Sequence, residues 1–251
     1  MSAAPVQLLE LDAELAQQIP ETDRAQAIRA LRTPVLAFRR GPLDLAEAQL
    51  PEATWALVVL SGTVLDESRL GDRELGELVL PGEVLLPWVP APTGLPSERA
   101  LRALGDVRLA VLDRQFLRAC AAWPQLMVTL SRRLNDQEHR VATRGLICQL
   151  PRVDQRVLAV LWHLAERIGR VSADGVIVPL DTTHAELGRL IGAQRPTVSL
   201  AIKQLTAGGA LQRRSAGGWL LCGEPFDAAS SASSVLQPKP RAASPAPVIG
   251  S

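Results

Sequence analysis

The chain has 251 residues, of which 47% are hydrophobic, and its net charge at pH 7 is +1. This length and composition suit a globular protein with one large domain or two modest ones. No run of 18 or more apolar residues occurs, so the sequence predicts no transmembrane helix. Because the acidic N-terminus lacks the basic start and apolar middle of a signal peptide, we expect a cytoplasmic protein.

Charge is distributed unevenly along the chain. Residues 1–112 hold 10 basic and 16 acidic side chains, whereas residues 181–223 hold 5 basic and 2 acidic ones. Binding to phosphate needs a local positive surface, so the C-terminal third is the candidate region for contact with nucleic acid. The three cysteines form no CxxC pair, and their odd number does not suit a disulfide framework.

The N-terminal segment is predicted to be helical from its start. Apolar residues recur at near-helical spacing from Leu8 to Ile19, and Pro20 ends this run. A second helical stretch is expected from about Asp23 to Leu31.

Residues 34–112 contain short apolar runs that are separated by glycine and proline. The runs include PVLAF, WALVVLSGTV and ELVLPGEVLLPW. Short strands with regularly spaced turn residues are typical of an antiparallel barrel or sandwich. We therefore predict an antiparallel β-barrel as the main part of a first domain, residues 1–112.

A long helical region is predicted over residues 113–150. Six residues are spaced by three, four and seven positions: Met127, Leu130, Leu134, Gln137, Val141 and Cys148. This spacing is the pattern of a coiled-coil seam, so we interpret the segment as a dimerisation helix. The alternative is a long helix that packs on its own domain.

Pro151 marks the start of a C-terminal domain, residues 151–223. A helix with one apolar stripe is expected from Asp154 to about Gly169. The dipeptide Asp174-Gly175 then predicts a tight hairpin turn.

Residues 181–223 predict a winged helix-turn-helix. Thr183 and Glu186 have the spacing of a capping box at the start of a first helix, and Gly192 can adopt the positive φ that ends it. A second helix begins near Arg195, with a proline in its first turn. The segments ALQRR and WLL then flank a glycine-rich turn and form the wing.

Polar and basic side chains occupy the expected outer face of the second helix and of the wing. Arg195 suits a bidentate contact with guanine and Gln194 a contact with adenine, whereas Lys203 is placed for a backbone phosphate. The predicted DNA-binding residues are Thr183, Gln194, Arg195, Thr197, Ser199, Lys203, Arg213 and Arg214. The second helix would enter the major groove of the DNA.

The segment THAELGRLIGAQRPTVSLAIKQLTAGGALQRR resembles the DNA-binding domain of the Crp/Fnr superfamily of bacterial transcription regulators. The resemblance implies an α+β fold with a cyclic-nucleotide-binding-like β-barrel, a long dimerisation helix and a C-terminal winged helix-turn-helix. It covers residues 30–223 and matches the predicted order of elements. It also implies a homodimer on double-stranded DNA, with RNA polymerase as a further partner.

The region that would hold a cyclic nucleotide departs from the family pattern. Pro87 stands where a ribose-binding Glu is expected, and Ala100 follows Arg99 in place of a hydroxyl residue. Glu83 and Arg99 remain as candidate effector-pocket residues, and the alternative for Arg99 is an ordinary surface or salt-bridge residue. We expect poor binding of cyclic AMP and no cofactor or metal, and the sequence leaves the effector undefined.

Other functions find less support in the sequence. An enzyme is not expected, because there is no Gly-rich phosphate loop, GxSxG elbow or HExxH motif, and the isolated His and Cys residues lack metal-ligand spacing. A ligand-insensitive module whose winged helix binds a protein is the remaining alternative. The Pro-, Ser- and Ala-rich segment 224–251 is expected to be disordered.

Overall fold

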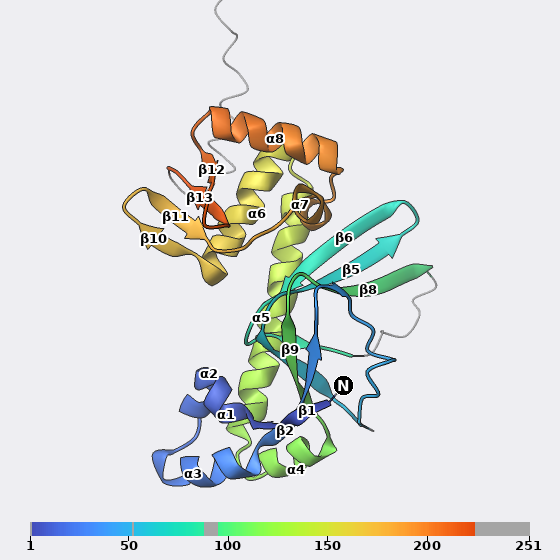
Figure 1. Cartoon of the computed structure of the whole chain (residues 1–251), viewed down its shortest axis with the longest axis vertical. Coiled ribbons are helices and arrows are strands. Elements are labelled where there is room, and N and C mark those ends of the chain that lie inside the picture. Colours follow the sequence, from blue (N-terminus) through green and yellow to red (C-terminus); the bar gives the residue numbers. More distant parts are fainter. Residues whose placement is uncertain (1, 52, 88–94, 224–251) are drawn as a thin grey trace, which may run out of the picture.

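The computed structural model describes residues 2–51, 53–87 and 95–223. A β-sandwich and a winged-helix unit are joined by one long helix (Figure 1). No helix within these ranges is long and apolar enough to cross a membrane. The segment that we expect to be disordered, residues 224–251, lies outside the described residues.

A strand precedes the first helix in the described residues, so the expectation that the N-terminal segment is helical from its start is wrong. β1 (Ser2–Gln7) pairs antiparallel with β2 (Arg32–Phe38). The connection between them holds α1 (Leu8–Leu11), α2 (Ala13–Gln17) and α3 (Glu21–Ala30). Pairing with a distant strand, rather than local apolar spacing, decides the conformation of the first residues.

Two antiparallel sheets form the sandwich, with strand orders β1-β2-β9-β4-β7 and β3-β8-β5-β6. The remaining strands are β3 (Gly41–Pro42), β4 (Ala56–Ser61), β5 (Val64–Leu70), β6 (Arg73–Val79), β7 (Val84–Leu85), β8 (Ser97–Ala103) and β9 (Val107–Leu112). Leu57, Val64 and Leu109 are fully buried in the core that both sheets share. The predicted antiparallel architecture is confirmed, but the sheets stay open instead of closing into a barrel.

The turn between β4 and β5 requires glycine. Gly62 has a φ of +83°, and a Cβ atom there would lie 2.3 Å from the carbonyl oxygen of Asp106. Only a residue without a side chain fits this position. Gly71 has a φ of +60° and closes the hairpin of β5 and β6, in which seven residue pairs are in register.

The helical region predicted over residues 113–150 consists of two helices. α4 (Arg114–Cys120) and α5 (Gln125–Cys148) are separated by a short turn that ends at Pro124. Proline has no N–H to donate, so it is tolerated where a helix begins. α5 then runs along the sandwich and reaches the winged-helix unit (Figure 1).

Residues of the predicted coiled-coil seam lie in two different environments. Leu130 is fully buried in the N-terminal core, and Gln137 exchanges two hydrogen bonds of 2.9 Å with the backbone of Val84. Leu134 is half-buried, and Val141 is 42% exposed. Part of the seam therefore packs on its own domain, as in the alternative interpretation, while Val141 stays accessible.

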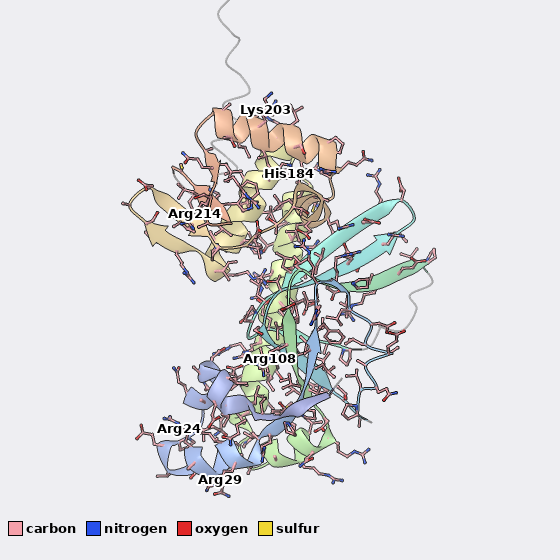
Figure 2. The ribbon with its side chains drawn as sticks, in the orientation of Figure 1. Arg24, Arg29, Arg108, His184, Lys203 and Arg214 are labelled. Atoms are coloured by element: carbon pink, nitrogen blue, oxygen red, sulfur yellow. The ribbon has the colours of Figure 1, made fainter. Side chains whose placement is uncertain are left out.

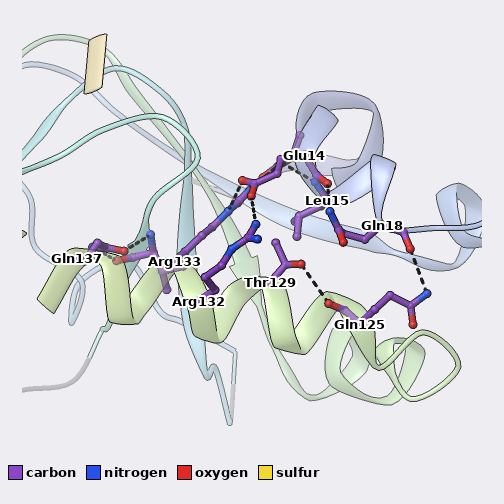
Figure 3. A network of polar contacts seen from close by, with 10 residues as sticks. Glu14, Leu15, Gln18, Gln125, Thr129, Arg132, Arg133 and Gln137 are labelled. Atoms are coloured by element: carbon purple, nitrogen blue, oxygen red, sulfur yellow. Dashed lines mark hydrogen bonds and ion pairs between the residues drawn. The ribbon is translucent and has the colours of Figure 1, made fainter. Parts of the chain in front are cut away.

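A buried ion-pair cluster fastens the N-terminal helices to α5 (Figure 3). Arg133 Nη1 and Nη2 donate to the carboxylate of Asp12 at 2.6 and 2.7 Å, and Arg133 Nε and Nη2 donate to Glu14 Oε2 at 3.0 and 2.7 Å. The side chains of Arg133 and Asp12 are only 9% and 6% exposed. This cluster joins segments that are about 120 residues apart in the sequence.

The C-terminal unit has the predicted winged-helix elements. They are α6 (Val153–Ile168), β10 (Arg170–Ser172), β11 (Gly175–Val178), α7 (His184–Ile191), α8 (Arg195–Ala207), β12 (Leu211–Arg213) and β13 (Trp219–Leu221). The four strands form one sheet in the order β10-β11-β13-β12. Leu161, Leu187, Val198 and Trp219 are almost completely buried between the helices and this sheet.

The winged-helix unit rests on the β5–β6 hairpin of the same chain (Figure 1). Leu65 and Leu78 of the hairpin are buried in the same apolar core as Leu187 of α7. Glu67 Oε1 also lies 2.7 Å from Arg189 Nε on α7. The sandwich therefore contacts the winged helix directly as well as through α5.

Candidate nucleic-acid interface

The first helix of the pair, α7, begins with the predicted capping box. Thr183 Oγ1 accepts a hydrogen bond of 3.1 Å from the Glu186 N–H, and a Glu186 side-chain oxygen accepts one of 2.7 Å from the Thr183 N–H. Gly192 ends the helix with a φ of +62°. Thr183 is exposed, but its hydroxyl already has this structural role.

The turn between the two helices depends on a second glycine that the sequence analysis did not identify. A Cβ atom at Gly188 would lie 2.4 Å from the carbonyl oxygen of Ala193. Gly188 therefore allows the backbone after α7 to fold back against the helix. A glycine inside a predicted helix was the only signal in the sequence, and it is a weak one.

The second helix, α8, presents polar residues on the outside of the molecule. Gln194, Arg195 and Thr197 are exposed at its N-terminus, whereas Val198 is fully buried. Figure 2 shows Lys203 on the outer side of the same helix, at the end of the molecule opposite Arg29. The burial of one face thus fixes which residues the helix presents to a ligand.

Ser199 has partners within the protein. Its hydroxyl donates to the carbonyl oxygen of Arg195 at 3.0 Å and lies 2.9 Å from His184 Nδ1 on α7. Burial lowers the pKa of His184, and the nearby Arg213 and Arg195 lower it further. A neutral His184 therefore links the two helices through Ser199. Sequence reasoning did not find this contact, because it joins residues on different helices.

The predicted wing residues Arg213 and Arg214 have different environments. Arg213 lies 4.5 Å over the ring of Trp219, donates to the Thr182 carbonyl oxygen at 3.0 Å and pairs with Asp181. These contacts hold the base of the wing to the segment before α7. Arg214 is half-buried at the turn of the wing (Figure 2).

The interface has an excess of unpaired positive charge. Within the described residues, Arg195, Lys203 and Arg214 have no ion-pair partner. Both acidic residues of the segment are engaged, because Asp181 pairs with Arg213 and Glu186 belongs to the capping box. Nucleic-acid phosphates would meet free cations on this surface.

The predicted effector residues line a separate cavity of about 640 Å³ between the sandwich and α5. Arg99 Nε and Nη2 donate to the Asp66 carboxylate at 2.8 and 2.6 Å, and its Nη1 donates to the Leu86 carbonyl oxygen at 2.9 Å. Glu83 pairs with Arg140 at 3.0 Å and with Arg167 at 2.7 Å. The salt-bridge alternative for Arg99 is thus present. In the described part of the chain, no cluster of His, Cys, Asp and Glu could hold a metal ion.

Together, these elements define a protein with an N-terminal β-sandwich, a long connecting helix and a C-terminal winged helix whose α8 has an exposed polar face. Residues 155–222 match the family model of the Crp-like helix-turn-helix domain. The chain is 32% identical over 112 residues to the CRP-like cAMP-activated global transcriptional regulator of Mycobacterium tuberculosis. That alignment covers 43% of this chain, and it spans about half, 48%, of the length of the curated relative.

Two solved structures share the fold over most of both chains. A CooA mutant from Carboxydothermus hydrogenoformans has a TM-score of 0.61 at 16% identity, covering 88% of this chain and 93% of that one. A cyclic nucleotide-binding domain containing protein from Listeria monocytogenes has a TM-score of 0.62 at 16% identity, covering 84% and 97%. The predicted resemblance to the Crp/Fnr superfamily is confirmed by the helix-turn-helix match and by the relative, and the two solved structures show a shared fold.

Proposed function

We propose that this protein is a sequence-specific, DNA-binding transcription regulator that acts as a homodimer. The observation that carries the proposal is the N-terminus of α8 in a Crp-like winged helix, where Gln194, Arg195 and Thr197 are exposed. Among the described residues, no carboxylate pairs with Arg195, so its guanidinium is available to a ligand.

In the proposed complex, α8 lies in the major groove. The forked guanidinium of Arg195 matches the O6 and N7 acceptors of guanine, whereas Lys203 and Arg214 contact phosphates. Two such helices in a two-fold dimer would meet successive major grooves, roughly 34 Å apart. RNA polymerase is the further partner that we propose for a regulator of this type.

Replacing Arg195 with alanine is expected to weaken specific DNA binding by about 1–3 kcal/mol, or roughly 5- to 150-fold, because a bidentate base contact is lost. The Arg195→Ala variant should also discriminate less between bases at one base pair in each half-site. Sites selected from a random DNA library, followed by fluorescence anisotropy on the selected site, would measure both effects.

The matched control for this experiment is Arg29→Ala, since Arg29 lies on α3 at the opposite end of the molecule (Figure 2). Its affinity should equal that of the unmodified protein. Equal affinity and preference for the Arg195 variant would contradict the major-groove role. Binding that does not weaken with salt would instead favour a protein partner for the winged helix.

The homodimer is supported by apolar side chains that α5 leaves in contact with water. Val128, Val141 and Leu146 are 69%, 42% and 66% exposed. Three large exposed apolar residues on one helix favour a partner surface. A second copy of α5 is the partner that we propose, because Val141 belongs to the predicted coiled-coil seam and remains accessible.

Replacing Val141 with glutamate is expected to raise the dimer dissociation constant on the order of a hundredfold, because an unpaired carboxylate would be buried in an apolar interface. Sedimentation equilibrium over a range of protein concentrations measures this constant. Val171→Glu is the control, since Val171 is 90% exposed in β10 rather than on α5. A Val141 variant that dimerises as well as the control would show that the seam lies elsewhere.

A further inference from the structure

The cavity beside α5 has walls that are mainly apolar. It is bounded by the β5–β6 hairpin, by β7 and by α5, and its lining includes Leu75, Leu85, Leu86 and Leu134. Its volume of about 640 Å³ is in the range of sites that enclose small molecules. Ser68, at the edge of the cavity, is exposed and gives access to it from β5.

A cyclic nucleotide does not fit the charges of this cavity. The residue that would meet its phosphate, Arg99, is bound by both oxygens of Asp66. The lining has four acidic residues and three basic ones: Asp66, Glu77, Glu83, Glu98, Arg99, Arg140 and Arg144. A phosphate would add a further negative charge beside Asp66, where no excess of positive charge compensates it. The lining therefore does not favour an anionic ligand.

Arg144 in the lining has two buried N–H groups that form no hydrogen bond within the described residues, and only one of them lies beside a carboxylate. The side chain of Arg144 is only 8% exposed, and its Nε lies 2.7 Å from Glu77 Oε2. Its Nη1 is buried and has no hydrogen-bond acceptor among the described residues. A buried N–H that is left unsatisfied is unfavourable, and an acceptor atom on a ligand would relieve it. The Nε atom of Arg144 already lies beside the carboxylate of Glu77, so a neutral oxygen is a sufficient acceptor for Nη1.

We propose that this cavity binds an uncharged, mainly apolar small molecule that offers a hydrogen-bond acceptor, such as a carbonyl oxygen, to Arg144. The apolar walls exclude water from the body of this ligand, and Arg144 orients it. Binding of this ligand does not depend on the proposed function. Only its effect on DNA binding rests on that function.

The same ion pairs connect the cavity to the winged helix. Glu77 contacts Arg144 on α5 and, at 3.3 Å, Arg167 on α6. Glu83 likewise contacts both Arg140 on α5 and Arg167. α6 is the first helix of the winged-helix unit, so a ligand that moves Arg144 must also disturb the contacts that hold α6. Occupation of the cavity would thus shift the position of the recognition helix.

Nile red, an uncharged aromatic dye with a carbonyl oxygen, is the probe for this site. Its fluorescence should rise saturably with the full-length protein, and cyclic AMP should not displace it. Ser68→Trp places a bulky ring at the cavity from an exposed strand position and should weaken dye binding at least tenfold. Arg69→Trp, an exposed position on the same strand that does not line this cavity, is the control and should bind normally.

Arg144→Met removes the donor and should weaken dye binding while thermal unfolding verifies that the variant is folded. Equal binding by the Ser68 variant would place the dye elsewhere, and displacement by micromolar cyclic AMP would show a nucleotide site. Either result overturns the proposal. So does a Ser68 effect that the Arg69 control reproduces.

Hydrogen–deuterium exchange tests the connection without any DNA. Saturation with Nile red should change exchange over α6 and α7 in the unmodified protein but not in the Ser68 variant. Unchanged exchange would overturn the coupling. A protein that binds the dye as expected but binds no DNA would contradict the proposed function and leave the assignment of the cavity intact.

Discussion

Replacing Arg133 with methionine is expected to lower the free energy of unfolding by about 3–5 kcal/mol, because it leaves buried carboxylate charge without its partner. Arg133 donates to both oxygens of Asp12, which is 6% exposed, and also to Glu14 (Figure 3). Methionine fills a similar volume, so the loss of stability would come from the missing charge rather than from a cavity. Urea denaturation followed by circular dichroism measures the change.

The neighbouring Arg132 provides the matched control. It also contacts Glu14, but its side chain is 56% exposed. An exposed ion pair contributes about 0–1 kcal/mol, so Arg132→Met should have a small effect. If both variants lost the same free energy of unfolding, burial would not determine how much each ion pair contributes to stability. An Arg133 variant as stable as the unmodified protein would contradict the role of the cluster altogether.

Replacing Trp219 with alanine is expected to destabilise the winged-helix unit by about 3–5 kcal/mol, because a large buried side chain leaves a cavity. Trp219 is 1% exposed, donates from Nε1 to Thr182 Oγ1 at 3.2 Å and lies under Arg213. The wing should loosen as well, so DNA affinity should fall even at temperatures where the variant stays folded. Calorimetric unfolding and fluorescence anisotropy on a selected DNA site measure the two losses.

Trp219→Phe separates packing from the hydrogen bond. Phenylalanine keeps most of the apolar volume and the aromatic face under Arg213, but it cannot donate to Thr182. We expect this variant to retain most of the stability and of the DNA affinity. Retention of both properties by the alanine variant would show that Trp219 does not organise the wing.

Local patterns were sufficient to predict the helix-turn-helix. The capping box of Thr183 and Glu186, the positive φ of Gly192 and the start of α8 at Arg195 are all confirmed. Each of these features depends on residues within three or four positions of one another, through hydrogen bonds and dihedral preferences. The roles of the eight predicted DNA-binding residues remain predictions, because they depend on a partner.

Long-range contacts account for what the sequence analysis missed. The strand conformation of β1 depends on its pairing with β2. Leu130 and Gln137 contact their own chain, rather than a second copy, because the sandwich lies beside α5. A spacing of three, four and seven shows that one face of a helix is apolar, but not which surface covers it. The break between α4 and α5 could have been placed from Pro124, since proline favours the start of a helix.

The sequence by itself determined the order of the three main parts, the winged helix-turn-helix and the exposed residues Gln194, Arg195 and Thr197 at the start of α8, because periodicity, caps and turns are local. Only the tertiary structure decided which basic side chains have no acidic partner and so remain available to a ligand. It pairs Arg99 with Asp66 and Arg213 with Asp181, while Arg195 stays without an acidic partner in the part of the chain that the structure describes. Ion pairs between residues more than 30 positions apart follow from how the elements pack, and no local spacing specifies them.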